Sequence, residues 1–202
     1  MNNTTINYYN KNSKQLVNRY ESVDMTDMQK LLVDSFNKDS SLLEIGCGSG
    51  RDASFMVKNN YNIIAIDSSL NMINEAIKMH SELNTKLLVM KVPEELNFDI
   101  KFDGIYSIAT LMHLSKDNLN YVVSKVYNLL NKNGKFIISV SLFRDDINSD
   151  GFDNKGRFFL ILTLDEWIDI FKNIGFNIIK TRISKDGLNR DGVEWLTLVV
   201  KK

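Results

Sequence analysis

The sequence predicts an α/β fold, a three-layer sandwich whose seven-stranded, mostly parallel sheet ends in an antiparallel pair of C-terminal strands. Three observations predict it. Short apolar runs alternate with segments whose apolar residues recur at helical spacing. The first five apolar runs are continuous, which is typical of parallel strands covered by helices on both faces. The last two runs are joined by a short connection, which favours antiparallel neighbours.

Two helices are expected before the first strand. Residues 12–37 place Leu16, Tyr20 and Val23, and then Met28, at helical spacings. These helices would form an N-terminal cap over residues 1–40, with the sheet and its helices in 41–202. No linker or low-complexity stretch interrupts the chain, so one domain is expected over 1–202.

The sheet is expected to grow by alternation of strands and helices. The predicted strands are 41–46, 61–67, 86–92, 102–109 and 135–143, and the predicted helices are 51–60, 69–80 and 116–130. Ser68 or Ser69 is a suitable N-cap for the second of these helices, because a serine hydroxyl accepts a hydrogen bond from a free amide there. The third is expected to end at the sequence NKNG, with Gly134 near its C-cap.

The end of the chain departs from strict alternation. Residues 163–175 form a predicted helix with a capping-box pattern at Thr163 and Glu166. Two strands, 176–184 and 193–202, follow, joined by the sequence KDGLNRDG. Because this connection is too short for a crossover, the two strands are expected to pair antiparallel at one edge of the sheet.

Composition limits the function classes. The chain has 202 residues, a formal net charge of zero and a pI of about 6.7, which gives no support for a strongly basic nucleic-acid face. The absence of a long apolar run and of an apolar leader core predicts a cytoplasmic protein without membrane contact. One cysteine and two distant histidines predict neither an internal disulfide nor a dedicated metal site.

A glycine-rich turn follows the first predicted strand. Gly46, Gly48 and Gly50 give the spacing G-x-G-x-G, one residue shorter than the dinucleotide fingerprint. Glycines let the backbone turn sharply beside a ligand, and the helix that follows directs free amides and partial positive charge to it. Asp67 ends the second strand, where an acid is placed to accept hydrogen bonds from ribose hydroxyls. Either feature alone could be only a turn or a cap, but together they predict a nucleoside ligand.

Two residues favour S-adenosylmethionine over a nicotinamide dinucleotide. Glu44 lies two positions before Gly46, where its charge would repel a pyrophosphate but suits a cationic amino acid and a sulfonium. Arg51 stands where a dinucleotide loop keeps its third glycine for close helix packing. The predicted ligand is therefore a methyl donor.

The stretches LLEIGCGSGRD, IIAIDSSLNMI, FDGIYSIATLMHLS and LLNKNGKFIISVS resemble successive motifs of class I S-adenosylmethionine-dependent methyltransferases, over residues 41–141. The resemblance implies a Rossmann-like core with a seven-stranded sheet whose last strand is inserted antiparallel. It also implies an enzyme that uses S-adenosyl-L-methionine as cofactor. The C-terminal strand pair matches more weakly.

The resemblance implies a role for each matching position. Gly46 and Gly48 would line the methionine portion of the cofactor, with Cys47 packed between them, and Glu44 would help hold its amino group. Asp67 would bind the ribose hydroxyls. Further contacts to adenine, ribose or the methyl group would come from Ser68, Met72, Val92 and Ser107. The third strand lacks the acid that many members have, so the adenine contact is left open between Val92 and Glu94.

The methyl acceptor is expected beyond the fourth strand. His113 is the candidate catalytic residue, as a base or a polar wall, although it could equally pack the next helix. Tyr8 and Tyr9 of the N-terminal segment, and Arg144 and Arg157 of the long polar segment 141–159, are candidate substrate-binding residues. Segments after parallel strands lie at the ligand-binding edge of such sheets.

The acceptor itself stays open between several classes. No [DN]PP[YF] tetrapeptide follows the fourth strand, which with the neutral charge favours a small molecule. The sequence SIATLMHLS is also similar to the matching stretch of enzymes that methylate modified tRNA uridines, so a tRNA wobble-uridine methyltransferase is the alternative. Loops of the GSGRD type also resemble tellurite- and thiol-detoxifying enzymes. A third possibility is a non-catalytic S-adenosylmethionine-binding protein. The chain is expected to be a monomer or a homodimer.

Overall fold

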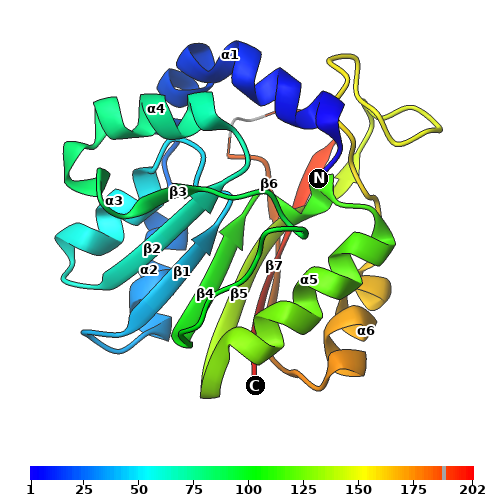
Figure 1. The fold of residues 1–202 in the computed structure, drawn as a ribbon. Helices are drawn as coiled ribbons and strands as arrows, with labels where there is room; N and C mark the ends of the chain where they lie inside the picture. Colours follow the sequence, from blue (N-terminus) through cyan, green and yellow to red (C-terminus); the bar gives the residue numbers. More distant parts are fainter. Residues whose placement is uncertain (188–189) are drawn as a thin grey trace.

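The computed structural model describes residues 1–187 and 190–202. Its centre is a seven-stranded sheet in the order β3-β2-β1-β4-β5-β7-β6 (Figure 1). The strands are β1 (Ser41–Ile45), β2 (Asn62–Asp67), β3 (Leu87–Val89), β4 (Phe102–Ile108), β5 (Leu130–Arg144), β6 (Asn177–Lys185) and β7 (Val193–Lys201). The first five strands pair in parallel, and β7 is antiparallel to both of its neighbours, β5 and β6. The predicted fold class is confirmed.

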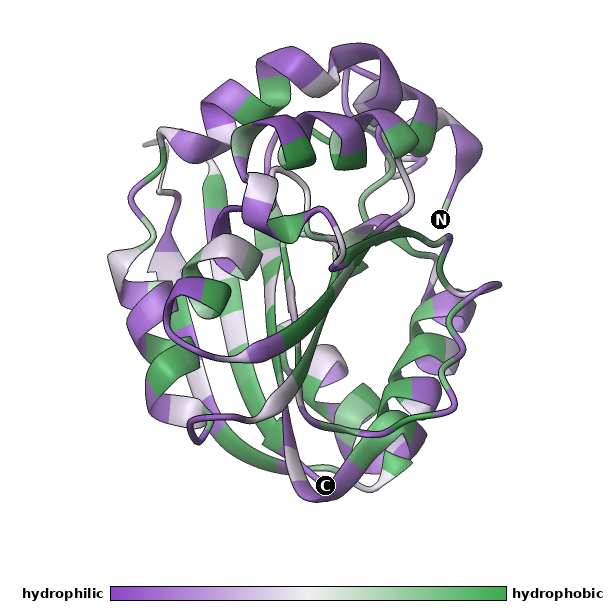
Figure 2. Ribbon diagram, turned by 60° about the vertical axis from the view of Figure 1, so that its left-hand side comes forward, coloured by the Kyte–Doolittle hydropathy of each residue, from purple (hydrophilic) through white to green (hydrophobic). Residues whose placement is uncertain are grey.

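Helices cover both faces of the sheet. They are α1 (Asn3–Glu21), α2 (Thr26–Ser35), α3 (Arg51–Lys58), α4 (Leu70–Met79), α5 (Lys116–Leu129) and α6 (Leu164–Ile174). Apolar residues of α5 and α6 form one buried cluster with the sheet, and residues of α2, α3 and α4 form a second cluster on the other face. Figure 2 shows the hydrophobic strands enclosed between helices whose outer faces are hydrophilic. Burial of these two apolar surfaces is the main force that holds the layers together.

The first helix lies across the edge where the parallel strands end. In Figure 1, α1 runs beside α4 above the carboxyl ends of β1, β2 and β4, and the two helices are in contact. Leu16 and Val17 of α1 pack against Met72 of α4. The N-terminal segment therefore covers the edge of the sheet at which ligands bind in folds of this type.

Several boundaries differ from those that the sequence predicts, among them the start of β5, which lies at Leu130 rather than at residue 135. Helix α1 begins at Asn3 rather than near residue 12, because the Asn2 side chain caps it by accepting a hydrogen bond from the Thr4 amide. Helix α5 ends before Leu130, so the expected cap at Gly134 is wrong; the turn there uses Asn133, with a φ of 66°. Strand β3 is also shorter than expected.

Two predicted caps are confirmed. Ser69 accepts a hydrogen bond from the Met72 amide at the start of α4, and Thr163 and Glu166 form the capping box of α6. Residues 188 and 189, within the predicted connection between β6 and β7, lie outside the described residues. In the part of the chain that the structure describes, no helix is long and apolar enough to span a membrane.

Candidate functional site

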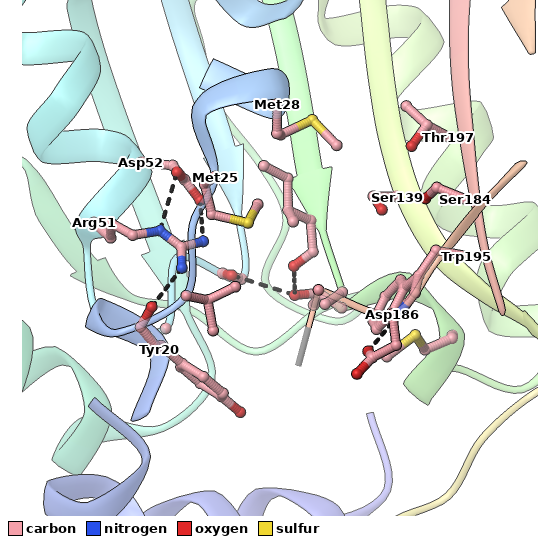
Figure 3. Close-up of a pocket in the computed structure, with 18 of the residues that line it drawn as sticks. Tyr20, Met25, Met28, Arg51, Asp52, Ser139, Ser184, Asp186, Trp195 and Thr197 are labelled. Carbon is pink, nitrogen blue, oxygen red and sulfur yellow. Dashed lines mark hydrogen bonds and ion pairs between the residues drawn. The ribbon is translucent and has the colours of Figure 1, made fainter. Parts of the chain in front are cut away.

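A cavity of about 550 Å³ lies at the carboxyl ends of the parallel strands. Its wall is formed by the glycine loop after β1, the ends of β4 and β5, helix α1, and the β6–β7 strands (Figure 3). This size is within the range of pockets that hold small molecules and cofactors. The cavity brings together chain segments from both ends of the sequence.

The glycine loop adopts the left-handed backbone that its residues predict. Gly46 has a φ of 79°, and an added Cβ there would overlap the Thr110 side chain. The amides of Gly46 and Cys47 donate to the Ile66 carbonyl at 2.7 and 2.9 Å, which fixes the loop against the end of β2. The loop backbone therefore lies on the cavity wall because no side chain intervenes.

Two acids flank this loop, Glu44, which is buried, and Asp67, which is partly buried. Asp67 accepts hydrogen bonds from the Gly48 amide at 3.0 Å and from the Ser69 amide at 2.8 Å. Glu44 is 2% exposed, and one of its oxygens accepts from the Tyr106 hydroxyl at 3.2 Å. Burial raises the pKa of Asp67 and raises the pKa of Glu44 well above its ordinary value. A cation placed beside Glu44 would stabilise its charged form.

Arg51 makes its hydrogen bonds to other partners than Glu44 and Asp67 among the described residues, although its charge acts on Glu44. Its guanidinium donates to Asp52 at 3.2 and 2.8 Å and to the Tyr20 carbonyl at 2.5 Å, as Figure 3 shows. The Arg51 side chain thus ties the start of α3 to the end of α1.

His113 also lines the cavity, in the turn Leu111–His113 that follows β4. Its Nδ1 is 2.6 Å from the Phe158 carbonyl, which can only accept, so Nδ1 carries the proton. Its Nε2 then accepts from the Tyr9 hydroxyl at 2.9 Å. Burial, aided by Arg157 and Arg144, lowers the pKa of His113 to about 4. The imidazole is therefore neutral at physiological pH.

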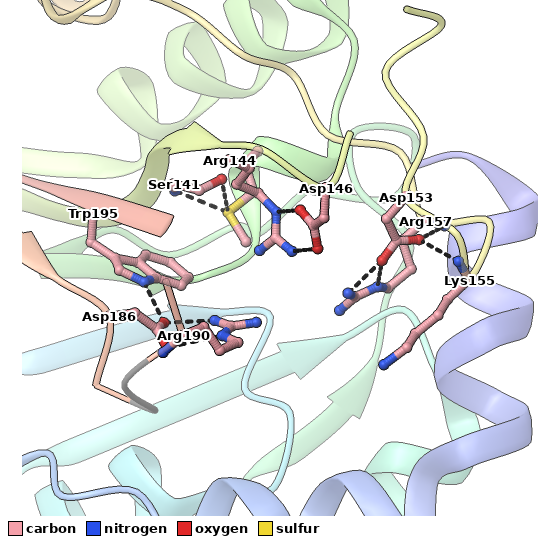
Figure 4. A network of polar contacts seen from close by, with 10 residues as sticks. Ser141, Arg144, Asp146, Asp153, Lys155, Arg157, Asp186, Arg190 and Trp195 are labelled. Carbon is pink, nitrogen blue, oxygen red and sulfur yellow. Dashed lines mark hydrogen bonds and ion pairs between the residues drawn. The ribbon is translucent and has the colours of Figure 1, made fainter. Parts of the chain in front are cut away.

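Arginine–aspartate pairs lie near His113, and Arg144, Arg157 and Asp153 act on its pKa. Figure 4 shows the pairs Arg144–Asp146 and Arg157–Asp153. Arg144 donates to Asp146 at 2.8 and 2.5 Å, and its guanidinium lies 4.3 Å from the Phe159 ring centroid. Arg157 donates to Asp153 at 2.8 and 2.5 Å. Both arginines line the cavity.

The predicted site residues fall into three groups. The first group lines the main cavity: Glu44, Gly46, Cys47, Gly48, Asp67, Tyr9, His113, Arg144 and Arg157. Ser68 and Val92 line a second, much smaller cavity, which also contains Asp67 and Gly46. The third group contacts these walls from behind: Met72 packs under α1, the Ser107 hydroxyl donates to the Ile45 carbonyl, and the Tyr8 ring lies under Arg157.

Sequence reasoning missed one arginine of this wall. Arg190 lines the cavity and donates to Asp186, which also accepts from the Trp195 indole. The spacing D-x-x-x-R that joins Asp153 to Arg157 recurs at Asp186 and Arg190. That repeat was a signal in the sequence that could have found Arg190.

The donor set suits the predicted cofactor. Gly46, Cys47 and Gly48 line the cavity, and Glu44 presents a buried carboxyl group whose one hydrogen-bond donor among the described residues is the Tyr106 hydroxyl. A sulfonium with an ammonium group fits such a carboxylate, whereas a pyrophosphate does not. Among the described residues, no cluster of three or more ligating side chains could hold a metal ion.

A doubly covered sheet with one inserted antiparallel strand, and a glycine loop with an acid at the end of β2, define the class of cofactor-binding α/β proteins to which class I methyltransferases belong. The family model described as a methyltransferase domain matches residues 17–181. The chain therefore belongs to this family, and the S-adenosylmethionine-dependent methyltransferase class predicted from the motifs is confirmed, with S-adenosylmethionine as the cofactor of the domain.

Individual relatives are more distant. The chain is 28% identical to phosphoethanolamine N-methyltransferase of Plasmodium falciparum, over 78% of this chain and 60% of that protein. It is 32% identical to ubiquinone biosynthesis O-methyltransferase of Pelagibacter ubique, over 50% of this chain and 42% of that protein. It thus spans about half the length of these curated relatives.

The solved structures agree on the fold. The crystal structure of Burkholderia thailandensis 1,6-didemethyltoxoflavin-N1-methyltransferase, with bound 1,6-didemethyltoxoflavin and S-adenosylhomocysteine, superposes with a TM-score of 0.77. The superposition covers 98% of this chain and 87% of the chain of that enzyme, and the two sequences are 17% identical. At this identity the likeness extends to the fold alone.

Proposed function

We propose that this protein transfers a methyl group from S-adenosylmethionine directly to a small-molecule acceptor bound in the cavity. The observation that carries the proposal is the convergence of Glu44, the glycine loop and Asp67 on one cavity that Tyr9 and His113 also line. We refer to Glu44, the glycine loop and Asp67 as the donor side. Tyr9 and His113, with Arg144 and Arg157, form the acceptor side.

The donor side would hold the cofactor through the backbone and two acids. The remaining oxygen lone pairs of Asp67 would accept hydrogen bonds from ribose hydroxyls. The second carboxylate oxygen of Glu44 would attract the ammonium group. Cys47 would pack as a small side chain, because burial raises the pKa of its thiol well above the ordinary value. When bound, the cofactor supplies an electrophilic methyl group on a sulfonium.

The acceptor side would orient the nucleophile. In-line displacement needs positioning above all, and a protein base only where the acceptor must lose a proton. His113 would act through Tyr9, since its Nε2 lone pair already accepts from the Tyr9 hydroxyl. We therefore propose His113 as a positioning residue that fixes the phenol on the cavity wall.

The test combines binding with turnover. S-adenosylhomocysteine and NAD are titrated into the full chain by calorimetry, and methyl release from labelled S-adenosylmethionine is measured against fractionated metabolites and, separately, against tRNA. We expect binding of S-adenosylhomocysteine but not NAD, and turnover on a metabolite fraction. Turnover on tRNA would favour the alternative acceptor, and tight binding without turnover on any pool would indicate a non-catalytic binding protein.

A further inference from the structure

The acceptor side carries an excess of unsatisfied hydrogen-bond donors. Three arginines line it: Arg144, Arg157 and Arg190. Each is fixed by one aspartate, which accepts from the Nε and Nη2 edge of the guanidinium. A guanidinium has five N–H donors, so each of these pairs leaves the Nη1 edge over. The Nη1 groups of Arg144 and Arg190 make no hydrogen bond within residues 1–187 and 190–202, whereas the guanidinium of Arg157 also interacts with the Tyr9 hydroxyl.

The aspartates, in contrast, already have many donors. Asp153 accepts from the amides of Lys155 and Arg157 as well as from the Arg157 side chain. Asp186 accepts from the Arg190 amide and the Trp195 indole in addition to the guanidinium. Of the three aspartates, only Asp186 lines the cavity. Asp146 and Asp153 therefore orient their arginines from outside the cavity lining, and the carboxylate of Asp186 is occupied by the Arg190 and Trp195 donors.

The guanidinium groups are close enough to act on one site. Arg144 and Arg157 lie 4.3 and 5.1 Å from the centroid of the same ring, Phe159. Both guanidinium charges contribute to the lowered pKa of His113, and the charge of Arg157 opposes the rise that Asp186 causes in the pKa of Arg190. The Arg144 side chain is 2% exposed whereas its partner Asp146 is 45% exposed, so water screens the aspartate far more than the arginine.

Taking the proposed function as its basis, we propose that the acceptor carries an oxyanion, a carboxylate or a phosphate, that binds the Nη1 edges of Arg144 and Arg190 beside the charge of Arg157. Planar guanidinium groups match the geometry of both oxyanions and are the preferred partners where either is recognised. The acidic donor side at Glu44 and Asp67 disfavours an anion, so the charge distribution orients the acceptor. Its anionic group lies against the arginines, and its nucleophile points to the donor side.

The experiment titrates inorganic phosphate and, in a second arm, acetate into the full chain, with and without saturating S-adenosylhomocysteine. Nitrogen–proton spectra of the arginine side chains report which guanidinium responds. We expect saturable binding that shifts the signals of Arg144, Arg157 and Arg190. The arm with the tighter binding assigns the oxyanion as phosphate or carboxylate.

Arg144→Gln is the main variant, because its partner Asp146 is exposed and no buried charge is left unpaired. It should weaken anion binding about 10- to 100-fold, the effect of one charge-assisted hydrogen bond. Arg182→Gln is the matched control: Arg182 also lines the cavity and pairs with an aspartate, Asp27, but is half exposed. The control should bind the anion as the wild type does.

Three results would overturn the proposal: no saturable binding of either anion, equal weakening in Arg182→Gln, or loss of S-adenosylhomocysteine affinity in Arg144→Gln to the same degree. The last would mean that the arginines hold the carboxylate of the cofactor. Failure of the proposed function is a separate outcome, in which the wild type does not bind S-adenosylhomocysteine. The anion titration without S-adenosylhomocysteine still shows whether the three arginines bind an oxyanion.

Discussion

The donor side and the acceptor side of the cavity are built in different ways. The donor side consists of one continuous βαβ unit, from Glu44 through the loop to Asp67, and depends on left-handed glycines. The acceptor side combines Tyr9, His113 and the three arginines, which are far apart in the chain and held by charge pairs and aromatic contacts. Substitutions on the donor side should therefore act through backbone conformation, and substitutions on the acceptor side through the charge of the side chains.

The largest effect expected from this difference is at Gly46. Gly46→Ala would force a left-handed alanine into overlap with Thr110, whereas Gly156, in the segment that carries Arg157, has a φ of 78° and no described atom within 4 Å of an added Cβ. The left-handed conformation costs roughly 1–2 kcal/mol, and overpacking adds about 1–3 kcal/mol. Gly46→Ala should therefore lose about 3 kcal/mol or more of unfolding free energy in urea, and Gly156→Ala only about 1 kcal/mol. Equal losses would show that Thr110 yields to the added methyl group.

Within the acceptor side, the burial of the aspartate should decide the cost of losing an arginine. Asp153 is 1% exposed and Asp146 is 45% exposed. Arg157→Gln leaves a buried carboxylate without its cation and should cost roughly 3 kcal/mol, while Arg144→Gln should cost about 1 kcal/mol. Arg157→Lys, which keeps the charge, should recover part of the loss. Denaturant unfolding at neutral pH measures all three, and an equal cost for the two glutamine variants would contradict this account.

The two sides should also separate in binding. Asp67→Ala removes the acceptor of the Gly48 and Ser69 amides and of the proposed ribose contacts. Its affinity for S-adenosylhomocysteine should fall about 10- to 100-fold. Asp67→Asn, which keeps one carbonyl oxygen, should lie between Ala and wild type. Arg144→Gln serves as the control and should keep wild-type affinity in the same calorimetric titration. If Asp67→Ala bound as wild type does, Asp67 would have no part in the cofactor site.

How much the sequence predicts follows from the same contrast. Local patterns predict the strands and helices in chain order and the residues of the donor side. These patterns are apolar periodicity, the G-x-G-x-G spacing, and Asp67 at the end of a strand. These depend on neighbours in the chain, so sequence alone suffices for them. The start of α1 at Asn3 was missed because an asparagine cap before a polar segment gives no apolar periodicity.

The acceptor side could be predicted only in part. Arg144 and Arg157 were candidates because they follow a strand that ends at the ligand-binding edge. Arg190 was not a candidate. It lies just before β7, and the start of β7 reaches the ligand-binding edge, opposite Arg144, only because β7 is inserted antiparallel beside β5. The tautomer of His113 depends on the Phe158 carbonyl and the Tyr9 hydroxyl, contacts between segments about 45 and 104 residues away. No local pattern specifies such contacts.

The smallest expected effect is on the pH dependence of stability. His113 on the acceptor side and Glu44 on the donor side should change the unfolding free energy in opposite directions as the pH falls. His113 has a folded-state pKa of about 4, below its ordinary value of 6.5, so the unfolded chain binds more protons in that window. The stability that neutral His113 contributes is therefore lost as the pH falls. Between pH 6.5 and about 5, His113→Gln should lose about 1.5 kcal/mol less unfolding free energy than wild type.

Glu44 works in the other direction. Its pKa is raised by burial, so the folded protein holds a proton that the unfolded chain releases, and this contribution is lost as the pH rises through the folded-state pKa. Since Glu44 is present in both wild type and His113→Gln, its contribution cancels in their difference. Glu44→Gln should steepen the fall in stability on acidification, while His113→Gln flattens it. Urea unfolding at several pH values measures the slope of unfolding free energy against pH for each variant and for wild type. If both variants changed this slope in the same direction, burial would not govern the protonation of Glu44 and His113.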